Sequence, residues 1–248
     1  MKNVELRTSV ELMKGWTFTD RNGKDTKVDL PHTWNAKDGQ DGGNDYYRGT
    51  CHYRTVFRKP DFDPETQRVY LEFQGVNATA DVELNGQNVM HHDGGYSTFR
   101  GDVTELLKKD NTLKVAVDNS VNNRVYPQKA DFTFYGGIYR DVLLRIVPKE
   151  HFELDYYGGE GVKITPTVEG KDGVVRVESY HHTDDAQVTV TLLDADGKEA
   201  AKGTGTDILL RIPGVHLWDG VEDPYMYTAS VTLQRGEQIL DKVCIPFG

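Results

Sequence analysis

Apolar and polar residues alternate with a period of two along much of this chain. Ala80, Val82 and Leu84 fall on one face with acidic residues between them, and the segments 113–117 and 142–146 repeat the pattern. Successive side chains of a strand point to opposite faces, so this alternation predicts strands that bury one side. We therefore expect an all-β protein.

Turn and helix signals agree with that expectation. Asn85-Gly86 directly follows an alternating segment and supplies the two residues with positive φ that a type I′ hairpin requires. A helical turn is indicated at 102–109, where an acidic residue precedes Leu106 and Leu107, and it is short. The sequence therefore predicts strands joined by hairpins, with almost no helix.

The spacing of the strands changes near residue 148. The earlier part carries longer glycine-rich loops such as 38–43, which suits a jelly roll of two packed antiparallel sheets. The later part has short loops and evenly spaced strands, which suits an immunoglobulin-like sandwich. Its seven expected strands are 152–156, 162–168, 174–180, 188–192, 208–212, 225–233 and 239–245. We expect a jelly-roll domain at 1–148 and an immunoglobulin-like β-sandwich domain at 149–248.

Composition excludes two classes of partner. The 248 residues carry a formal net charge of −10 and no basic cluster, which argues against nucleic acid as a partner. No apolar run approaches the roughly 20 residues that span a bilayer, so no membrane partner is expected. The polar segment 2–9 lacks the apolar core of a signal peptide. An export signal could have been removed from the parent, so the sequence does not assign the protein to a cellular compartment.

Cysteine and histidine give no cofactor or metal site. Cys51 and Cys244 lie in different expected domains within apolar strand patterns, so we expect buried free thiols. The pairs His91-His92 and His181-His182 would point to opposite faces of a strand, and no thiol or carboxylate at ligand spacing supports either pair. We expect no metal and no cofactor.

One segment departs from simple alternation. Residues 130–142 combine several aromatic residues, three charges and the pair Gly136-Gly137 ahead of the strand expected from Val142 to Val147. Adjacent glycines permit positive φ or a close approach of another segment, so this segment is interpreted as a shaped corner.

The corner resembles the aromatic-Gly-Gly-Ile-Tyr-Arg-Asp-Val passage that closes the N-terminal jelly roll of glycoside hydrolase family 2 enzymes, the β-galactosidase and β-glucuronidase group. Further segments resemble the same family, in the same order along nearly the whole chain: 30–35, 47–49, 53–54, 84–86, 94–99, 217–218 and 223–227.

The resemblance implies a parent enzyme with a third domain. In that family a (β/α)8 barrel follows the two β domains and carries the acid/base and nucleophile of a retaining mechanism. The 248 residues leave no room for such a barrel, so the resemblance implies no catalytic residue here. The chain is expected to be the non-catalytic N-terminal part of an exo-acting β-glycosidase, with β-galactosidase favoured. Its implied partners are carbohydrate through the full-length enzyme, its own catalytic barrel, and further copies of the parent in a homo-oligomer.

Two acidic residues are the substrate-binding candidates that the resemblance implies. In β-galactosidases of the family, an aspartate shortly before the Gly-Ile-aromatic-Arg-Asp corner reaches the edge of the active site, and this position falls on Asp131. Asp45 lies near a second such position, by a looser match across the loop 37–43. A carboxylate there can accept hydrogen bonds from sugar hydroxyls or help to hold a cation. The alternative for Asp131 is a turn-forming aspartate.

Other conspicuous residues have structural interpretations. Trp16 and Trp34 could stack on sugar rings, but core packing is favoured because tryptophan is mostly buried in all-β domains. Trp218 resembles the internal tryptophan of the family's second domain and is expected in the core. Arg140 is expected to pair inside the corner.

Two other functions remain open. An independent carbohydrate-binding module with a spacer domain would present exposed aromatic residues on one face, whereas a bracing domain would present a docking patch. A surface adhesion protein rests on sandwich architecture alone, and fold does not decide function.

Overall fold

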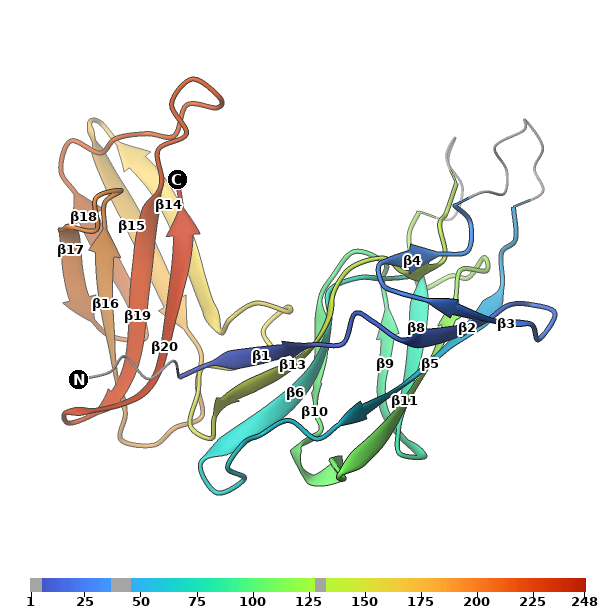
Figure 1. Ribbon diagram of the computed structural model, residues 1–248. Helices are drawn as coiled ribbons and strands as arrows, with labels where there is room; N and C mark the ends of the chain where they lie inside the picture. Colours follow the sequence, from blue (N-terminus) through green and yellow to red (C-terminus); the bar gives the residue numbers. More distant parts are fainter. Residues whose placement is uncertain (1–5, 37–45, 128–132) are drawn as a thin grey trace. The chain divides into compact units, whose positions relative to one another are not determined.

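The computed structural model describes residues 6–36, 46–127 and 133–248, and it confirms the all-β class (Figure 1). The chain divides into two compact units. The first unit, a jelly-roll sandwich, comprises Thr8–Val147. The second unit, an immunoglobulin-like sandwich, comprises Pro148–Gly248 together with the described residues Leu6 and Arg7.

The described residues of the first unit form three antiparallel sheets. In spatial order, the four-stranded sheet holds β1 (Thr8–Glu11), β13 (Val142–Pro148), β6 (Gln67–Phe73) and β10 (Phe99–Asp102). The six-stranded sheet holds, again in spatial order, β3 (Asp25–Val28), β2 (Trp16–Thr19), β5 (Thr50–Arg58), β11 (Asp110–Asp118), β8 (Thr79–Leu84) and β9 (Gln87–Asp93). A small sheet joins β4 (His32–Thr33), β12 (Gly137–Ile138) and β7 (Val76–Asn77).

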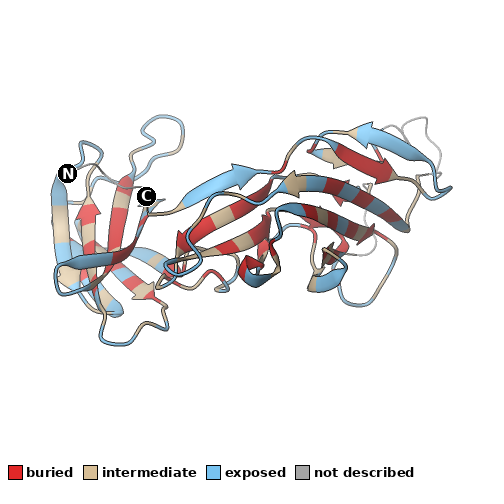
Figure 2. Cartoon of the chain, turned by 60° about the horizontal axis from the view of Figure 1, so that its bottom comes forward, coloured by how far each residue is buried: buried red, intermediate tan, exposed pale blue. Residues whose placement is uncertain are grey.

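Alternation along the strands builds the core of the first unit. Every second residue of β11 is buried, and Figure 2 shows the same alternation of buried and exposed positions along neighbouring strands. Trp16, Phe73 and Leu144 are completely buried in this core. The indole N–H of Trp16 donates to the carbonyl of Leu12 at 2.7 Å, so its one polar group is satisfied. Trp16 is therefore a core residue, as its sequence context predicts.

The predicted hairpin and helical turn both have counterparts. Asn85 and Gly86 have φ of 54° and 88°, the positive pair of a type I′ turn, and they join β8 to β9. The expected helical turn is a single 3-10 turn, Thr104–Leu106.

The second unit packs two antiparallel sheets around its own core. One holds β14 (Val162–Glu169), β15 (Asp172–Ser179) and β18 (Asp207–Ile212); the other holds β17 (Glu199–Thr204), β16 (Gln187–Leu193), β19 (Tyr227–Arg235) and β20 (Gln238–Phe247).

The set of strands expected in this unit is wrong at two places: one expected strand does not form, and one strand that does form was not expected. The segment 152–156 forms only an isolated bridge from Phe152 to His181. The strand β17 has exposed or half-buried side chains and so lacks the apolar alternation that predicts a strand.

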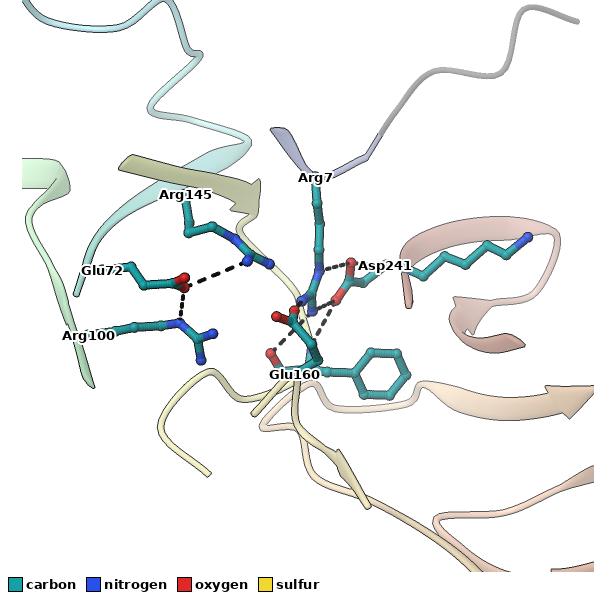
Figure 3. Close-up of polar contacts among 8 residues, drawn as sticks. Arg7, Glu72, Arg100, Arg145, Glu160 and Asp241 are labelled. Carbon is teal, nitrogen blue, oxygen red and sulfur yellow. Dashed lines mark hydrogen bonds and ion pairs between the residues drawn. The ribbon is translucent and has the colours of Figure 1, made fainter. Parts of the chain in front are cut away.

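An arginine from the start of the chain is built into the second unit (Figure 3). The side chain of Arg7 is 11% exposed and forms ion pairs with Asp241, which is fully buried, and with Glu160. Arg7 Nε lies 2.9 Å from Asp241 Oδ1, and the backbone N–H of Phe152 donates to Asp241 Oδ2 at 2.9 Å. The buried carboxylate is thus paired and hydrogen-bonded, as burial of a charge requires.

The first unit holds a second buried ion pair, drawn in the same figure. Glu72 on β6 is 1% exposed and pairs with Arg100 on the adjacent strand β10, while Arg145 on β13 lies 3.6 Å from the same carboxylate. Three neighbouring strands therefore share one compensated charge cluster.

The cysteines are both free, but only Cys51 is buried. Cys244 is exposed because it lies at an outward position of β20, so the expectation of burial is wrong there. Among the described residues, no helix is long and apolar enough to cross a membrane.

Candidate functional site

The two substrate-binding candidates, Asp131 and Asp45, lie outside the described residues. The structure does describe the segments that flank them, namely the chain up to Ala36 and from Tyr46, and up to Pro127 and from Thr133. These four segments belong to the first unit, and their contacts define the candidate site.

A buried asparagine joins the segments that follow the two candidates. Asn119 comes directly after β11 and is 0% exposed. Its side-chain N–H donates to the carbonyl of Phe134 at 2.7 Å and to that of Tyr47 at 3.5 Å. Its Oδ1 accepts the backbone N–H of Gly49 at 2.9 Å. One side chain therefore fixes the backbone two residues after Asp45 and three residues after Asp131.

A second buried asparagine completes this arrangement. Asn35 follows β4 and is 0% exposed. Its Oδ1 accepts hydrogen bonds from the backbone N–H of Gly136 at 2.7 Å and from the side-chain amide of Asn119 at 3.2 Å. Its own N–H donates to the carbonyl of Tyr47 at 2.9 Å. We call Asn35 and Asn119 the asparagine pair; it links the described ends of the two loops through hydrogen bonds to their backbone groups.

The glycine pair lies where the backbone passes closest to its neighbours. A Cβ at Gly136 would overlap the benzene ring of Trp34. Gly137 has φ of +141°, and a Cβ there would collide with the carbonyl of His32 and lie 2.9 Å from the Cα of Thr33. Both positions require glycine because β12 packs directly against β4 and Trp34.

An arginine covers the same region. Arg48 donates through Nε to the backbone carbonyl of Asn119 at 2.8 Å, and its guanidinium lies 4.7 Å from the centre of the Phe134 ring. This arrangement is a cation–π contact that holds the segment after Asp131 against the segment after Asp45.

Beside the asparagine pair lies an open hollow of about 680 Å³. Aromatic rings and small polar groups line it: Phe18, Asp20, Arg21, Asn22, Thr26, His32, Thr33, Trp34, Ala36, Tyr47 and Cys51. The Arg21 guanidinium lies 5.1 Å from the centre of the Tyr47 ring. Apolar ring faces combined with a few polar groups are the usual lining of a small-molecule site.

The titratable groups of the hollow are not arranged for glycoside hydrolysis. Asp20 is the one carboxylate among its described lining residues, and backbone hydrogen bonds from Lys24 and Asn22 hold its pKa below the usual value. His32 Nδ1 lies 2.7 Å from the Tyr53 hydroxyl, and burial lowers the pKa of His32. Burial also raises the pKa of the Cys51 thiol to about 11, which keeps it protonated. A retaining mechanism needs two carboxyl groups, and the described lining of the hollow offers one.

Two predictions about individual side chains are wrong. Trp218 is 55% exposed, because it lies in the loop between β18 and β19 instead of on a strand that faces the core. Arg140 is also exposed; it reaches outward to the carbonyl of Tyr96 at 3.2 Å. Arg48 and the asparagine pair hold the corner instead. Trp34 is half-buried: it lines the hollow and donates from its indole N–H to the carbonyl of Tyr47 at 3.2 Å.

Sequence reasoning did not identify the asparagine pair as a structural centre. Asn35 lies in the segment 30–35 that carries part of the family resemblance, and this resemblance could have indicated that the residue matters. Asn119 follows an alternating strand and looks like an ordinary strand-ending turn residue. Only the tertiary arrangement shows that it is fully buried.

Two family models match the chain. One, described as glycosyl hydrolase 2 galactose-binding domain-like, covers residues 43–151. The other, described as glycosyl hydrolases family 2, covers residues 160–248.

Named relatives match nearly all of the chain but only part of their own length. A β-glucuronidase of Bacteroides fragilis is 32% identical over 98% of this chain, which spans 38% of that relative. A β-galactosidase of Thermoanaerobacter pseudethanolicus is 30% identical over 89% of this chain, which spans 31% of that relative. A crystal structure of an FMN-binding β-glucuronidase from Facaelibacterium prausnitzii L2-6 superposes with a TM-score of 0.90 at 37% identity, covering 98% of this chain and 39% of that one.

Proposed function

The chain belongs to glycoside hydrolase family 2, and from this premise we propose that it is the non-catalytic N-terminal part of an exo-acting β-glycosidase. One observation carries the proposal: 98% of the chain aligns with a β-glucuronidase of which it spans only 38%. In the proposed parent, a catalytic barrel supplies the acid/base and the nucleophile, and the first unit braces the edge of the sugar site. The barrel and the carbohydrate are then its functional partners, and oligomerisation is a property of the parent.

The substrate proposal weighs two related sugars. On sequence a β-galactosidase is favoured, although the corner motif resembles both groups of the family. Two of the three relatives described above are β-glucuronidases, at 32% and 37% identity against 30% for the β-galactosidase. We therefore place β-glucuronosides first and β-galactosides second. The two sugars differ at C6, a carboxylate in one and a hydroxymethyl group in the other, so aryl glycosides of each distinguish the two.

The substrate-binding roles belong to Asp131 and Asp45. Their loops return to the asparagine pair, which fixes the backbone at Tyr47 and Phe134. Loops anchored this way are suited to carry side chains on a rigid scaffold, which is how many binding residues are presented. A carboxylate accepts hydrogen bonds from two sugar hydroxyls and gains strength from its charge.

The first experiment compares the purified 248-residue chain with its full-length parent on aryl β-glucuronide and aryl β-galactoside. We expect turnover from the parent and none from the chain, because the described lining of the hollow offers one carboxylate where a retaining mechanism needs two. Turnover by the chain that disappears when one of its own carboxylates is changed would contradict the proposal.

The second experiment changes Asp131→Ala in the parent. Loss of a charged hydrogen-bonding partner costs about 1.5–3 kcal/mol, so kcat/KM should fall roughly ten- to a hundred-fold while the melting temperature stays unchanged. Asp196→Ala, at an exposed turn of the second unit, is the matched control and should change neither quantity. Wild-type efficiency in Asp131→Ala would leave that residue a turn former.

The hollow supports a second candidate function, that of an independent carbohydrate-binding module. Its lining combines Trp34 and Tyr47 with Arg21 and Asn22, a set able to stack on a sugar and hydrogen-bond to it. Calorimetric titration of the chain with glucuronic acid, galactose and lactose distinguishes the two functions. A bracing unit should bind them weakly or not at all, whereas affinity of about 1–10 μM would favour the module.

A further inference from the structure

An apolar surface is exposed on the second unit. Leu217 and Trp218 are 53% and 55% exposed, Val168 is 53% exposed and Met226 is 39% exposed. We call these four residues the Trp218 patch. Single exposed apolar residues are ordinary, but a contiguous group that includes a tryptophan marks an interaction surface.

The patch is continuous and surrounds the last residue of the chain. Val168, Leu217 and Gly248 line one apolar hollow of about 120 Å³. Gly248 also lies against the other two members, since a Cβ built there would be 3.0 Å from Trp218 Cβ and 3.1 Å from Met226 Sδ. Gly248 therefore lies beside Trp218 and Met226 and shares one hollow with Val168 and Leu217.

The loop that carries the patch is held in place by its own contacts. Asp219 and Asp223 exchange backbone hydrogen bonds of 2.7 and 3.1 Å, which closes the turn after Trp218. His216 stacks on Tyr225 with ring centres 3.9 Å apart, and its Nε2 lies 2.6 Å from Asp223 Oδ2. The apolar side chains are thus presented on a braced loop, and a pre-ordered surface binds at a lower entropic cost.

We propose that the Trp218 patch is the docking surface for the catalytic domain of the full-length parent; this inference rests on the proposed function. The named relatives extend well beyond the matched part, which is 38% of one and 39% of another. Any residue joined to Gly248 starts within contact distance of Trp218 and Met226. In the proposed parent, a catalytic domain that follows Gly248 has the shortest path to the patch. A domain interface of this kind buries apolar side chains that are exposed in the separate part.

The first test is hydrogen exchange of the 248-residue chain and of the full-length parent. We expect backbone amides of residues 216–226 to exchange at least about tenfold more slowly in the parent, because docking excludes water from that loop. Amides of the turn 195–197, which lies in the same unit, are the reference and should exchange equally in both proteins. Equal exchange at 216–226 would overturn the proposal.

The second test is Trp218→Ser, with Leu209→Ser as the matched control. Leu209 is a 69%-exposed apolar residue of β18 outside the patch. In the chain alone, both variants should melt like wild type. In the parent, Trp218→Ser should lower the melting temperature and kcat by clear margins while Leu209→Ser does not. A wild-type melting temperature and kcat for Trp218→Ser in the parent would contradict the proposal that the patch is a docking surface.

These tests separate the inference from the proposed function. If the parent cleaves glycosides but its amides at 216–226 are not protected and Trp218→Ser has no effect, the proposed function stands and the docking surface is rejected. If the amides at 216–226 are protected but the parent cleaves neither aryl glycoside, the docking surface stands and the proposed function is rejected. Concentration-dependent dimerisation of the chain that Trp218→Ser abolishes would assign the patch to a second copy and overturn the proposal.

Discussion

Gly136 packs against the benzene ring of Trp34 so closely that a methyl group has no space. We expect Gly136→Ala to destabilise the first unit by about 1–3 kcal/mol, the usual cost of overpacking a core. Chemical denaturation measures the loss.

A double variant tests the cause of that loss. Trp34→Leu removes the ring atoms that the new methyl group would meet, so Gly136→Ala should cost clearly less in a Trp34→Leu background. An equal loss of stability from Gly136→Ala in the two backgrounds would show that the loss does not come from the contact with the Trp34 ring.

The half-buried histidine His32 is expected to make stability depend on pH. Burial holds its pKa below the ordinary 6.5, so the unfolded chain takes up the proton first as pH falls. Its contribution is therefore fully present above pH 6.5 and is lost as pH drops below it. His32→Gln should show a smaller fall in melting temperature between about pH 7.5 and about pH 5.5 than wild type.

His91 supplies the contrasting case. A hydrogen bond to Asp81 raises the pKa of His91, so its contribution is present below pH 6.5 and is lost as pH rises through the raised pKa. Because His91 is exposed, its effect is screened by solvent and should be the smaller of the two. A His32→Gln variant with the wild-type pH profile would show that burial of His32 has no such effect.

At the scale of elements, the asparagine pair joins strand ends that are distant in sequence. Asn119→Ala removes the hydrogen bonds to the N–H of Gly49 and to the carbonyl of Phe134, and a hydrogen bond of this kind contributes about 0.5–1.5 kcal/mol. We expect a clear loss of stability by denaturation and, in the parent, a raised KM as the loop ends separate. Asn88→Ala, at an exposed position of β9, should stay within about 0.5 kcal/mol of wild type.

An isosteric variant refines the test. Asn119→Asp keeps the oxygen that accepts from Gly49 but places a carboxylate oxygen against the carbonyls of Phe134 and Tyr47 at a fully buried position, so its stability should be no higher than that of Asn119→Ala. A stability equal to wild type would mean that the contact with Phe134 contributes nothing.

Elements with a strong local signal were predictable from the sequence. The hairpin at Asn85-Gly86 follows from residue types that tolerate positive φ, and β11 follows from strict alternation. The strand β17 was missed because neither of its faces is deeply buried. The roles of Asn119 and Trp218 were missed for a related reason: burial of a polar residue and exposure of an apolar one depend on tertiary neighbours.

At the scale of the whole molecule, the second unit depends on a residue from the other end of the chain. We propose that the two units are separate domains divided at residue 148, with Arg7 contributed to the second. Arg7→Ala leaves the buried carboxylate of Asp241 unpaired, which should destabilise that unit by about 3–5 kcal/mol. Denaturation followed by signals from each unit should show the loss in the second alone.

Arg211→Ala is the matched control for Arg7→Ala. Arg211 pairs with Glu169 and Asp172 at the surface of the same unit, and exposed pairs contribute about 0–1 kcal/mol. A loss for Arg7→Ala no larger than that of Arg211→Ala would show that the buried pair contributes no more than a surface pair.

The ion pair between Arg7 and Asp241 also sets an order of events during synthesis. The two residues are 234 positions apart, and a ribosome that adds about 5–20 residues per second needs roughly 12–47 s to cover that distance. Throughout this interval the arginine has been made and its carboxylate has not. A nascent chain paused before residue 241 therefore carries every residue of Thr8–Val147 while Arg7 still lacks the carboxylate of Asp241, so β20 completes the second unit by pairing with a residue made 234 positions earlier.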